Sequence, residues 1–180
     1  MDEVSPELTI ESHYVYRGRI VDLRVDTVRL PNGQTTVREI VEHRGAVAIV
    51  PLDDDGNVIL VRQFRKPAER YLLEIPAGTR DPDEPMEVCL HRELREETGF
   101  AAGKVERLAG YYSAVGFCTE FIGVYLATDL RRGQAGPDED EFIEVVPVPT
   151  GEALAMVARG DIVDGKTIIG LLSLKARGLA

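Results

Sequence analysis

Apolar and polar residues follow a strand-like pattern in the first 45 residues. Segments 13–30 and 35–43 are rich in Val, Ile, Tyr and Thr, and they flank the dipeptide Asn32-Gly33. β-Branched and aromatic residues favour strands, and Asn-Gly is typical of a tight turn between antiparallel strands. The pattern predicts a small N-terminal antiparallel β unit over residues 1–45, which is too small to be stable alone.

Longer apolar runs begin after residue 45. Segments 46–52 and 57–64 are almost continuously apolar and flank the turn sequence "DDDG" at 53–56. Such runs are typical of strands covered on both faces, and the turn predicts that the two strands form a second hairpin. Segment 71–78 predicts a short strand that ends in Pro-Ala-Gly. Further strands are expected at 105–113, 121–130 and 142–148.

Helical patterns occur between these strands and near the C-terminus. One helix is expected from Pro85, which is tolerated in a first turn, to Gly99, a plausible C-cap. Two more are expected at 150–160 and 165–178. A helix between strands and helices after them predict an α/β fold, a sandwich on a mixed sheet, for residues 46–180.

The first helix carries an unusual row of side chains. With about 3.6 residues per turn, Met86, Leu90, Glu93 and Glu97 lie on one face. That row starts apolar and ends acidic, with Glu96 at its edge. Like charges one turn apart are unfavourable unless cations lie between them, and hard divalent ions prefer oxygen ligands. Charge runs on helices are usually solvated faces with ion pairs such as that of Arg92 with Glu96, so the row alone leaves its role open.

Composition narrows the possible functions. The chain has 180 residues, of which 44% are hydrophobic, and a formal net charge of −10, which argues against binding to nucleic-acid backbones. Cys89 and Cys118 lack the number and spacing of a disulfide framework or a metal site, which favours a reducing compartment. No apolar run approaches the roughly 20 residues of a membrane span. We expect a cytoplasmic protein that does not bind membranes.

A specific motif extends over residues 78–100. It consists of Gly78, Glu84 after five residues, Arg92-Glu93-Leu94 after seven, Glu96-Glu97 after one, and Gly99-Phe100 after one. This spacing resembles the Nudix box, and the chain is therefore similar to Nudix hydrolases. The resemblance implies the Nudix α/β/α sandwich and metal-dependent cleavage of a nucleoside diphosphate linked to another moiety.

The resemblance also implies roles for the acidic residues of the box. Glu93 and Glu97 would be the principal metal ligands, with the backbone carbonyl of Ala77 as a third and Glu96 bound directly or through water. Two or three ions of Mg²⁺ or Mn²⁺ would be present with substrate bound. A carboxylate cluster can share these ions with the oxygens of a diphosphate.

The remaining box residues have structural roles by the same resemblance. Gly78 and Gly99 would serve the backbone, in the loop before the helix and at its cap. Arg92 would pair with Glu84. Because neighbouring helical side chains point about 100° apart, Arg92 is expected to be poorly aimed at the metals of Glu93.

Several segments outside the box resemble the ADP-ribose pyrophosphatase subfamily. They are the N-terminal strands and the sequences "VRQFRKP", "LLEIPAG" and "YYSAVGFCTEF". This implies a homodimer with exchanged N-terminal strands that help to build the nucleoside pocket. Arg65 would contact phosphate, and Glu74 would contact substrate or order the metal loop. Gly116 and Phe117 would lie in the substrate loop, where Val115 replaces the usual proline of the subfamily and removes a rigid φ.

A base that activates water is the last part expected. Related enzymes often place a glutamate on a loop before a late strand, and the acidic segment 136–141 offers Glu139 and Glu141. Glu96 is the alternative within the box. A solvated acidic loop without a catalytic role would have the same composition.

The resulting hypothesis is hydrolysis of a nucleoside diphosphate sugar, with ADP-ribose giving AMP and ribose 5-phosphate. The sequence leaves two alternatives open. One is a pyrophosphatase for another such sugar, for example GDP-mannose, because specificity depends on pocket contacts. The other is a non-catalytic nucleotide-sugar sensor, against which the intact acidic set argues.

Overall fold

The computed structural model describes residues 6–133 and 142–179, and the chain divides into two compact units. The first unit consists of Met1–Gly45 and Tyr112–Phe121, and the second of Ala46–Tyr111 and Ile122–Ala180. None of the helices in the described part of the chain is long and apolar enough to cross a membrane.

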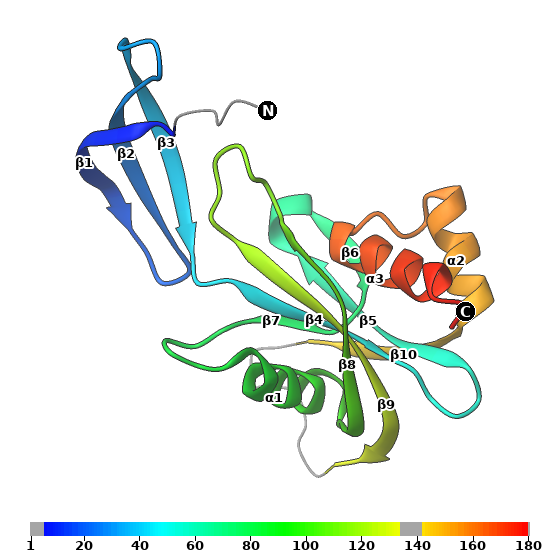
Figure 1. Cartoon of the computed structure of the whole chain (residues 1–180). Helices are drawn as coiled ribbons and strands as arrows, with labels where there is room; N and C mark the ends of the chain where they lie inside the picture. The colour runs from blue at the N-terminus through cyan, green and yellow to red at the C-terminus, as the bar shows by residue number, and fades with distance from the viewer. Residues whose placement is uncertain (1–5, 134–141, 180) are drawn as a thin grey trace. The chain divides into compact units, whose positions relative to one another are not determined.

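The first unit contains a three-stranded antiparallel sheet in the order β1-β2-β3 (Figure 1). Its strands are β1 (Leu8–Arg17), β2 (Val21–Arg29) and β3 (Thr35–His43). The expected turn joins β2 to β3, with Gly33 at a φ of +84°, which favours glycine. The prediction of N-terminal antiparallel strands is therefore confirmed.

Residues from far along the chain complete this unit. The N–H of Val41 donates to the carbonyl of Phe117 at 2.8 Å, and the N–H of Thr119 donates to the carbonyl of Val41 at 3.0 Å. Segment 112–121 therefore pairs with the end of β3 and belongs to the N-terminal unit.

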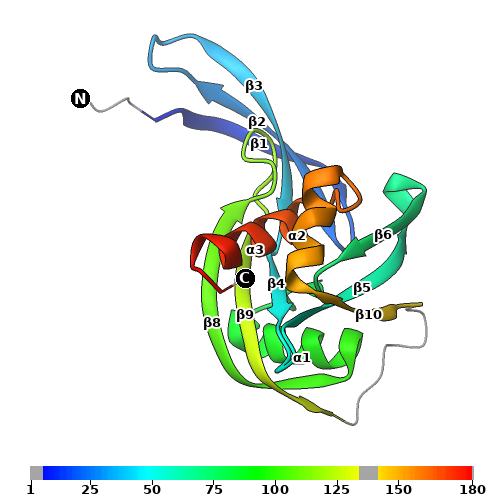
Figure 2. The ribbon, with the colours of Figure 1, turned by 90° about the vertical axis from the view of Figure 1, so that its right-hand side faces the viewer.

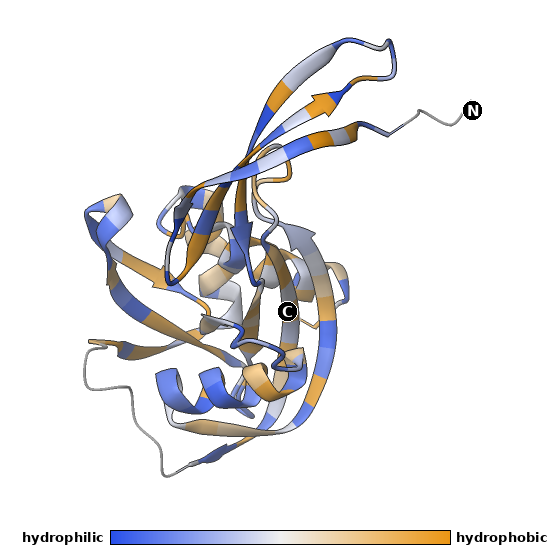
Figure 3. Cartoon of the chain, turned by 90° about the vertical axis from the view of Figure 1, so that its left-hand side faces the viewer, coloured by the Kyte–Doolittle hydropathy of each residue, from blue (hydrophilic) through white to orange (hydrophobic). Residues whose placement is uncertain are grey.

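Strand β1 is covered very little by the rest of the chain. Every one of its ten residues is exposed, and the apolar bands of the N-terminal strands are visible in Figure 3. Its large exposed apolar side chains are those of Leu8, Ile10, Tyr14, Val15 and Tyr16. Strand β1 therefore presents a row of exposed apolar side chains along its length.

The second unit is built on a mixed sheet in the order β7-β4-β9-β8. Strand β4 (Ala46–Pro51) pairs in parallel with β9 (Phe121–Arg132) and antiparallel with β7 (Ala77–Thr79). Strand β8 (Phe100–Tyr112) follows β9 at the edge, and Figure 2 shows the two strands running side by side. The mixed sheet agrees with the prediction.

Both faces of β4 are buried because helices pack against each of them. Val47 and Ile49 pack with the apolar residues of α1 (Met86–Thr98), and Val50, on the opposite face, packs with those of α3 (Gly165–Ala176). Successive side chains of a strand point to opposite faces, so an uninterrupted apolar run suits this position. The arrangement is the predicted α/β/α sandwich.

A second, three-stranded sheet has the order β10-β5-β6. It contains β5 (Asn57–Arg65), β6 (Arg70–Glu74) and β10 (Glu144–Pro149), and the short 3₁₀ helix Lys66–Ala68 connects β5 to β6. Helix α2 (Thr150–Arg159) follows β10 directly. Both C-terminal helices begin at the predicted residues.

The predicted hairpin of β4 and β5 was wrong. The turn forms, with the N–H of Asp53 donating to the carbonyl of Asn57 at 3.0 Å, but only an isolated bridge between Leu52 and Val58 pairs the two segments. The strands then diverge into different sheets. An apolar run predicts that a strand is buried, but it does not predict which strand will pair with it.

Candidate active site

Helix α1 begins and ends where the box predicts. It follows Pro85, and Gly99 adopts a φ of +71°, so that its N–H donates to the carbonyl of Arg95 at 2.9 Å. This is a glycine C-cap. The acidic row faces inward as expected, since Glu93 and Glu97 are only 9% and 5% exposed beside the fully buried Leu90.

Both inward carboxylates meet the backbone of β7. The N–H of Ala77 donates to Oε2 of Glu97 at 3.0 Å. At the next residue, a Cβ atom added to Gly78 would lie 1.9 Å from Cδ of Glu93. Two buried carboxylates thus converge on the Ala77-Gly78 segment, whose backbone carbonyls are further oxygen donors.

Gly78 was expected to serve the backbone before the helix. It is absent from the described glycines with positive φ. Its lack of a side chain instead makes room for Glu93. Gly99, by contrast, has the conformation that the prediction required.

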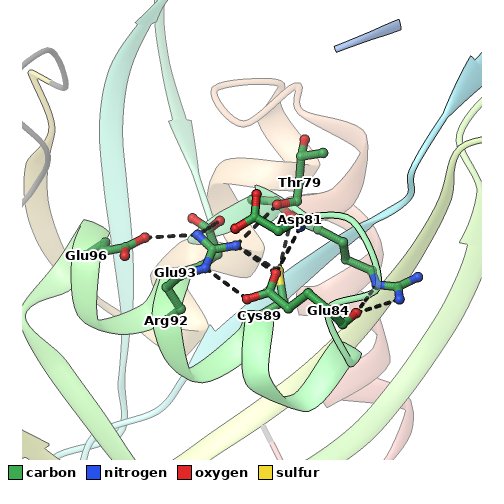
Figure 4. A network of polar contacts seen from close by, with 9 residues as sticks. Thr79, Asp81, Glu84, Cys89, Arg92, Glu93 and Glu96 are labelled. Carbon is green, nitrogen blue, oxygen red and sulfur yellow. Dashed lines mark hydrogen bonds and ion pairs between the residues drawn. The ribbon is translucent and has the colours of Figure 1, made fainter. Parts of the chain in front are cut away.

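Arg92 is the centre of a polar network on the outer side of the row (Figure 4). Its Nε and Nη2 donate to the two oxygens of Glu84 at 3.0 and 2.9 Å. Hydrogen bonds from Arg92 lower the pKa of Glu84 to about 2, and the same bonds raise the pKa of Arg92 above its ordinary value. This is the pairing that the resemblance implied.

Arg92 also reaches the carboxylates of the row itself. Its Nη1 donates to Glu93 at 2.5 Å and to Glu96 at 3.0 Å. The angle of about 100° between neighbouring residues describes the Cα–Cβ bonds, but the long arginine side chain bends back across that angle. Arg92 therefore holds three carboxylates at once.

The donor set fits a hard divalent cation. Glu93 and Glu97 present buried carboxylate oxygens beside backbone carbonyls, and Mg²⁺ and Mn²⁺ prefer oxygen donors of this kind. Within residues 6–133 and 142–179, no three His, Cys, Asp or Glu side chains already surround a common point. Because Arg92 donates to Glu93 and Glu96, these hydrogen bonds would have to open before either carboxylate oxygen that accepts them could ligate an ion.

A second charged group lies at the end of β6. Arg65 donates to the two oxygens of Glu74 from Nε and Nη2, both at 2.8 Å, and Lys166 of α3 donates to the same carboxylate. Glu74 is 1% exposed. Burial alone would raise its pKa, but the hydrogen bonds and charges of Arg65 and Lys166 outweigh burial and hold the pKa below its usual value.

The other predicted residues lie in different places. Gly116 and Phe117 belong to the N-terminal unit, where Phe117 is exposed. Glu139 and Glu141 lie outside the described residues. Cys89 lies on the buried face of α1, and burial raises the pKa of its thiol to about 12, which disfavours the reactive thiolate.

Sequence reasoning missed three residues at the start of α3, namely Asp164, Lys166 and Thr167. Asp164 caps the helix by accepting the N–H of Thr167 at 3.0 Å. A signal was present, because an aspartate just before a helical apolar pattern is an N-cap signature. Nothing in the sequence indicated that Lys166 would meet Glu74, since the two residues are far apart along the chain.

Comparison with known proteins extends the resemblance beyond the motif to nearly the whole chain. Residues 42–168 match the family model of the NUDIX domain. Residues 7–41 match the model of the nucleoside diphosphate sugar hydrolase N-terminal domain. The two matches together span nearly the whole chain and meet close to the boundary between the two structural units.

Individual relatives agree with these matches. An ADP-ribose pyrophosphatase of Bacillus subtilis (strain 168) is 41% identical, covering 95% of this chain and 94% of its own. A GDP-mannose pyrophosphatase of Enterobacter sp. (strain 638) is 35% identical, covering 98% and 95%. A solved structure described as an ADP compounds hydrolase superposes with a TM-score of 0.86 at 25% identity, covering all of both chains.

Proposed function

The chain belongs to the Nudix family of hydrolases, and we propose that it cleaves the diphosphate bond of a nucleoside diphosphate sugar, with ADP-ribose as substrate. The products are AMP and ribose 5-phosphate. The match of residues 7–41 to a nucleoside diphosphate sugar hydrolase domain supports the substrate class. The 41% identity to an ADP-ribose pyrophosphatase supports the choice of ADP-ribose.

One observation carries the proposal, namely the convergence of Glu93 and Glu97 on the backbone at Ala77 and Gly78. These carboxylates, the Ala77 carbonyl and Glu96 would hold two or three Mg²⁺ or Mn²⁺ ions. When bound, such ions neutralise the charge of the diphosphate and lower the pKa of a bound water. The protein contributes a rigid set of oxygen ligands from one helix and one strand.

The reaction itself is attack of water on one phosphorus of the diphosphate. The bond between that phosphorus and the bridging oxygen breaks, and the proton of the water passes to a carboxylate base. The candidates for the base are Glu139, Glu141 and Glu96. Among these, Glu96 is described, and its side chain is partly exposed at the rim of the acidic row.

Arg65 is suited to bind a phosphate oxygen of the substrate. Its side chain is 39% exposed, and two of its three nitrogens are occupied by Glu74. Guanidinium groups suit phosphate because their donors match its oxygens. Glu74 then orders Arg65 and the adjoining loop, and Gly116 and Phe117 remain proposed substrate contacts.

We also propose that the protein is a homodimer that exchanges its N-terminal strands. The exposed apolar residues of β1 support this proposal, because burying them requires another chain. A cytoplasmic location is part of the proposal as well. The described cysteines, Cys89 and Cys118, are both free, and free thiols persist in a reducing compartment.

A substrate panel tests the proposed function. The purified protein is incubated with Mg²⁺ and ADP-ribose, ADP-glucose, GDP-mannose, NADH or a diadenosine polyphosphate, and phosphate is measured after coupling to a phosphatase. We expect the highest kcat/KM for ADP-ribose. The variant Glu97→Gln serves as the inactive control. Absence of turnover with every compound would contradict hydrolysis and favour a non-catalytic sensor.

GDP-mannose is the second candidate substrate. It is supported by the GDP-mannose pyrophosphatase that is 35% identical over almost the whole chain. Val115 stands where the ADP-ribose subfamily usually has proline. Because it does not fix φ as proline does, the substrate loop can adopt a shape different from that of the subfamily. A kcat/KM for GDP-mannose above that for ADP-ribose would establish this alternative.

A further inference from the structure

The buried carboxylate of Glu74 is held by cations from two different elements. Arg65 of β5 donates to both of its oxygens at 2.8 Å, and Nζ of Lys166 from α3 donates to Oε2. A guanidinium fork uses one lone pair on each oxygen of a carboxylate and leaves further acceptor capacity, which Lys166 takes up at Oε2. The additional contact from Lys166 fixes the plane of the carboxylate and therefore the plane of the Arg65 fork.

The start of α3 also holds the backbone next to Glu74. The N–H of Ile75 donates to Oγ1 of Thr167 at 2.9 Å, and that hydroxyl donates to the capping carboxylate of Asp164 at 2.6 Å. Lys166 donates to the same carboxylate group at 3.0 Å. Helix α3 therefore binds both the side chain of Glu74 and the backbone that follows it.

The same stretch of backbone leads directly to the acidic row. Two residues after Ile75, the N–H of Ala77 donates to Glu97. Segment 74–77 is thus fixed by α3 at one end and by α1 at the other. A displacement of Glu74 would be passed both to Arg65 and to the carbonyl of Ala77.

We propose that Lys166 is a positioning residue for the hydrolysis, acting through Glu74 on Arg65. The inference rests on the proposed function. The Lys166 side chain is only 13% exposed and is directed to Glu74 and Asp164, so it does not contact the substrate itself. If Lys166 loses its charge, the carboxylate of Glu74, which is 1% exposed, has Arg65 as its remaining cationic partner. The guanidinium of Arg65 then turns further towards Glu74 and away from the phosphate.

Three variants test this role kinetically. Lys166→Met removes the charge and keeps the length of the side chain, Lys166→Arg restores a cation, and Lys175→Met removes an exposed lysine from the same helix as a control. With ADP-ribose and Mg²⁺, we expect Lys166→Met to raise KM about tenfold, because a misplaced binding group weakens substrate contact. Lys166→Arg should recover most of this loss, and Lys175→Met should match the wild type.

The kinetic pattern distinguishes positioning from loss of folded protein. A purely structural defect lowers the active fraction, so kcat falls and KM stays unchanged. In a Glu74→Gln background, Lys166→Met should add little further effect, because its contact acts through that carboxylate. An unchanged KM for Lys166→Met, or a full additional effect in the Glu74→Gln background, would overturn the proposal.

A measurement without turnover keeps the proposal separate from the identity of the substrate. The Nε–H resonance of Arg65 is recorded in the ¹⁵N spectrum of the metal-free protein and assigned by its loss in Arg65→Lys. We expect it to shift in Lys166→Met and to remain in place in Lys175→Met. If it does not move in Lys166→Met, or in Lys166→Gln should the methionine variant fail to fold, the proposal is wrong. If it moves while the wild type hydrolyses nothing, the proposed function fails and the kinetic role of Lys166 fails with it, whereas the control of Arg65 by Lys166 through Glu74 stands.

Discussion

Gly78 and Glu93 are so close that a Cβ atom on Gly78 would lie 1.9 Å from Cδ of Glu93. Real Cβ atoms essentially never approach other atoms within 3.0 Å, so the carboxylate fills space that only a glycine leaves. Although fifteen positions separate the two residues along the chain, the Glu93 carboxylate can occupy its place only because residue 78 has no side chain. The glycine of the box is required for the position of the carboxylate.

Gly78→Ala should therefore displace Glu93 without unfolding the protein. The clash involves the flexible end of a side chain, which can rotate away at modest cost. We expect turnover to fall about 100-fold, since a shift of about 1 Å in a positioned group can cost that much, and we expect little change in the melting temperature. Gly151→Ala is the control, because nothing lies within 4 Å of its added Cβ atom. Near-normal turnover of Gly78→Ala would contradict the role of Glu93.

Glu97→Gln should separate catalysis from stability. The amide oxygen can still accept the N–H of Ala77, so the loop stays in place, but the charge needed for a metal ligand is lost. We expect turnover to fall by orders of magnitude at saturating Mg²⁺. The metal-free melting temperature should hold or rise, because removing one of several neighbouring like charges relieves repulsion.

The matched control is Glu87→Gln, which removes an exposed carboxylate from the first turn of the same helix. It should leave both turnover and Mg²⁺ affinity, measured by titration calorimetry, unchanged. Wild-type turnover in Glu97→Gln would show that the metal site lies elsewhere.

The parts of this site that depend on local spacing were predictable. A helix from Pro85 to Gly99 with an inward acidic row follows from periodicity and caps alone, and the structure confirms it. Gly78 could be recognised as part of a motif, but its contact with Glu93 depends on how β7 packs against α1, which no local pattern describes.

Long-range pairings were not predictable. The divergence of β4 and β5 depends on competition between possible strand partners, and the contact of Lys166 with Glu74 depends on where α3 docks. A helical lysine next to an N-cap is normally a solvated residue. Only the fold brings it to a buried carboxylate, where its charge is needed.

The ion pair of Glu84 and Arg92 should affect stability in acid. Hydrogen bonds from Arg92 lower the pKa of Glu84 from 4.5 to about 2. A carboxylate with a lowered pKa in the folded state stabilises the fold above pH 4.5, and this contribution is lost as pH falls from 4.5 towards 2.

The measurement is urea unfolding of wild type and Glu84→Gln between pH 7 and pH 2. The variant should be less stable at pH 7, and the gap should narrow steadily below pH 4.5. Asp54→Asn, at an exposed turn position, is the control and should leave the pH dependence intact. A constant gap down to pH 2 would contradict the role of the pair.

The exposed apolar residues of β1 predict a dimer. Light scattering at micromolar concentration should give twice the mass of the 19.9 kDa chain. Leu8→Glu should shift the protein towards monomer, because it places a charge in the apolar contact. Thr9→Glu adds the same charge at the neighbouring, polar position, so it should disturb the dimer less. A fully active wild-type monomer would exclude the exchanged-strand proposal.

The base that activates water is the last group to be identified. If Glu139 or Glu141 is the base, its Gln variant should lose turnover with little change in KM or metal affinity, because a base acts on the water in the transition state. General-base assistance is typically worth ~10²–10⁴-fold, so the loss is easily measured. We favour Glu139, because its acidic neighbours suit a segment drawn towards cations.

Steady-state kinetics of the two single variants and the double variant decide between the candidates. A large loss in one single variant, with no further loss in the double variant, identifies that residue. If all three variants keep more than about a tenth of wild-type turnover, the loss is too small for the removal of a general base. The base would then be Glu96, which lies at the rim of the acidic row, and whose contact with Arg92 at 3.0 Å would have to open before it could accept a proton.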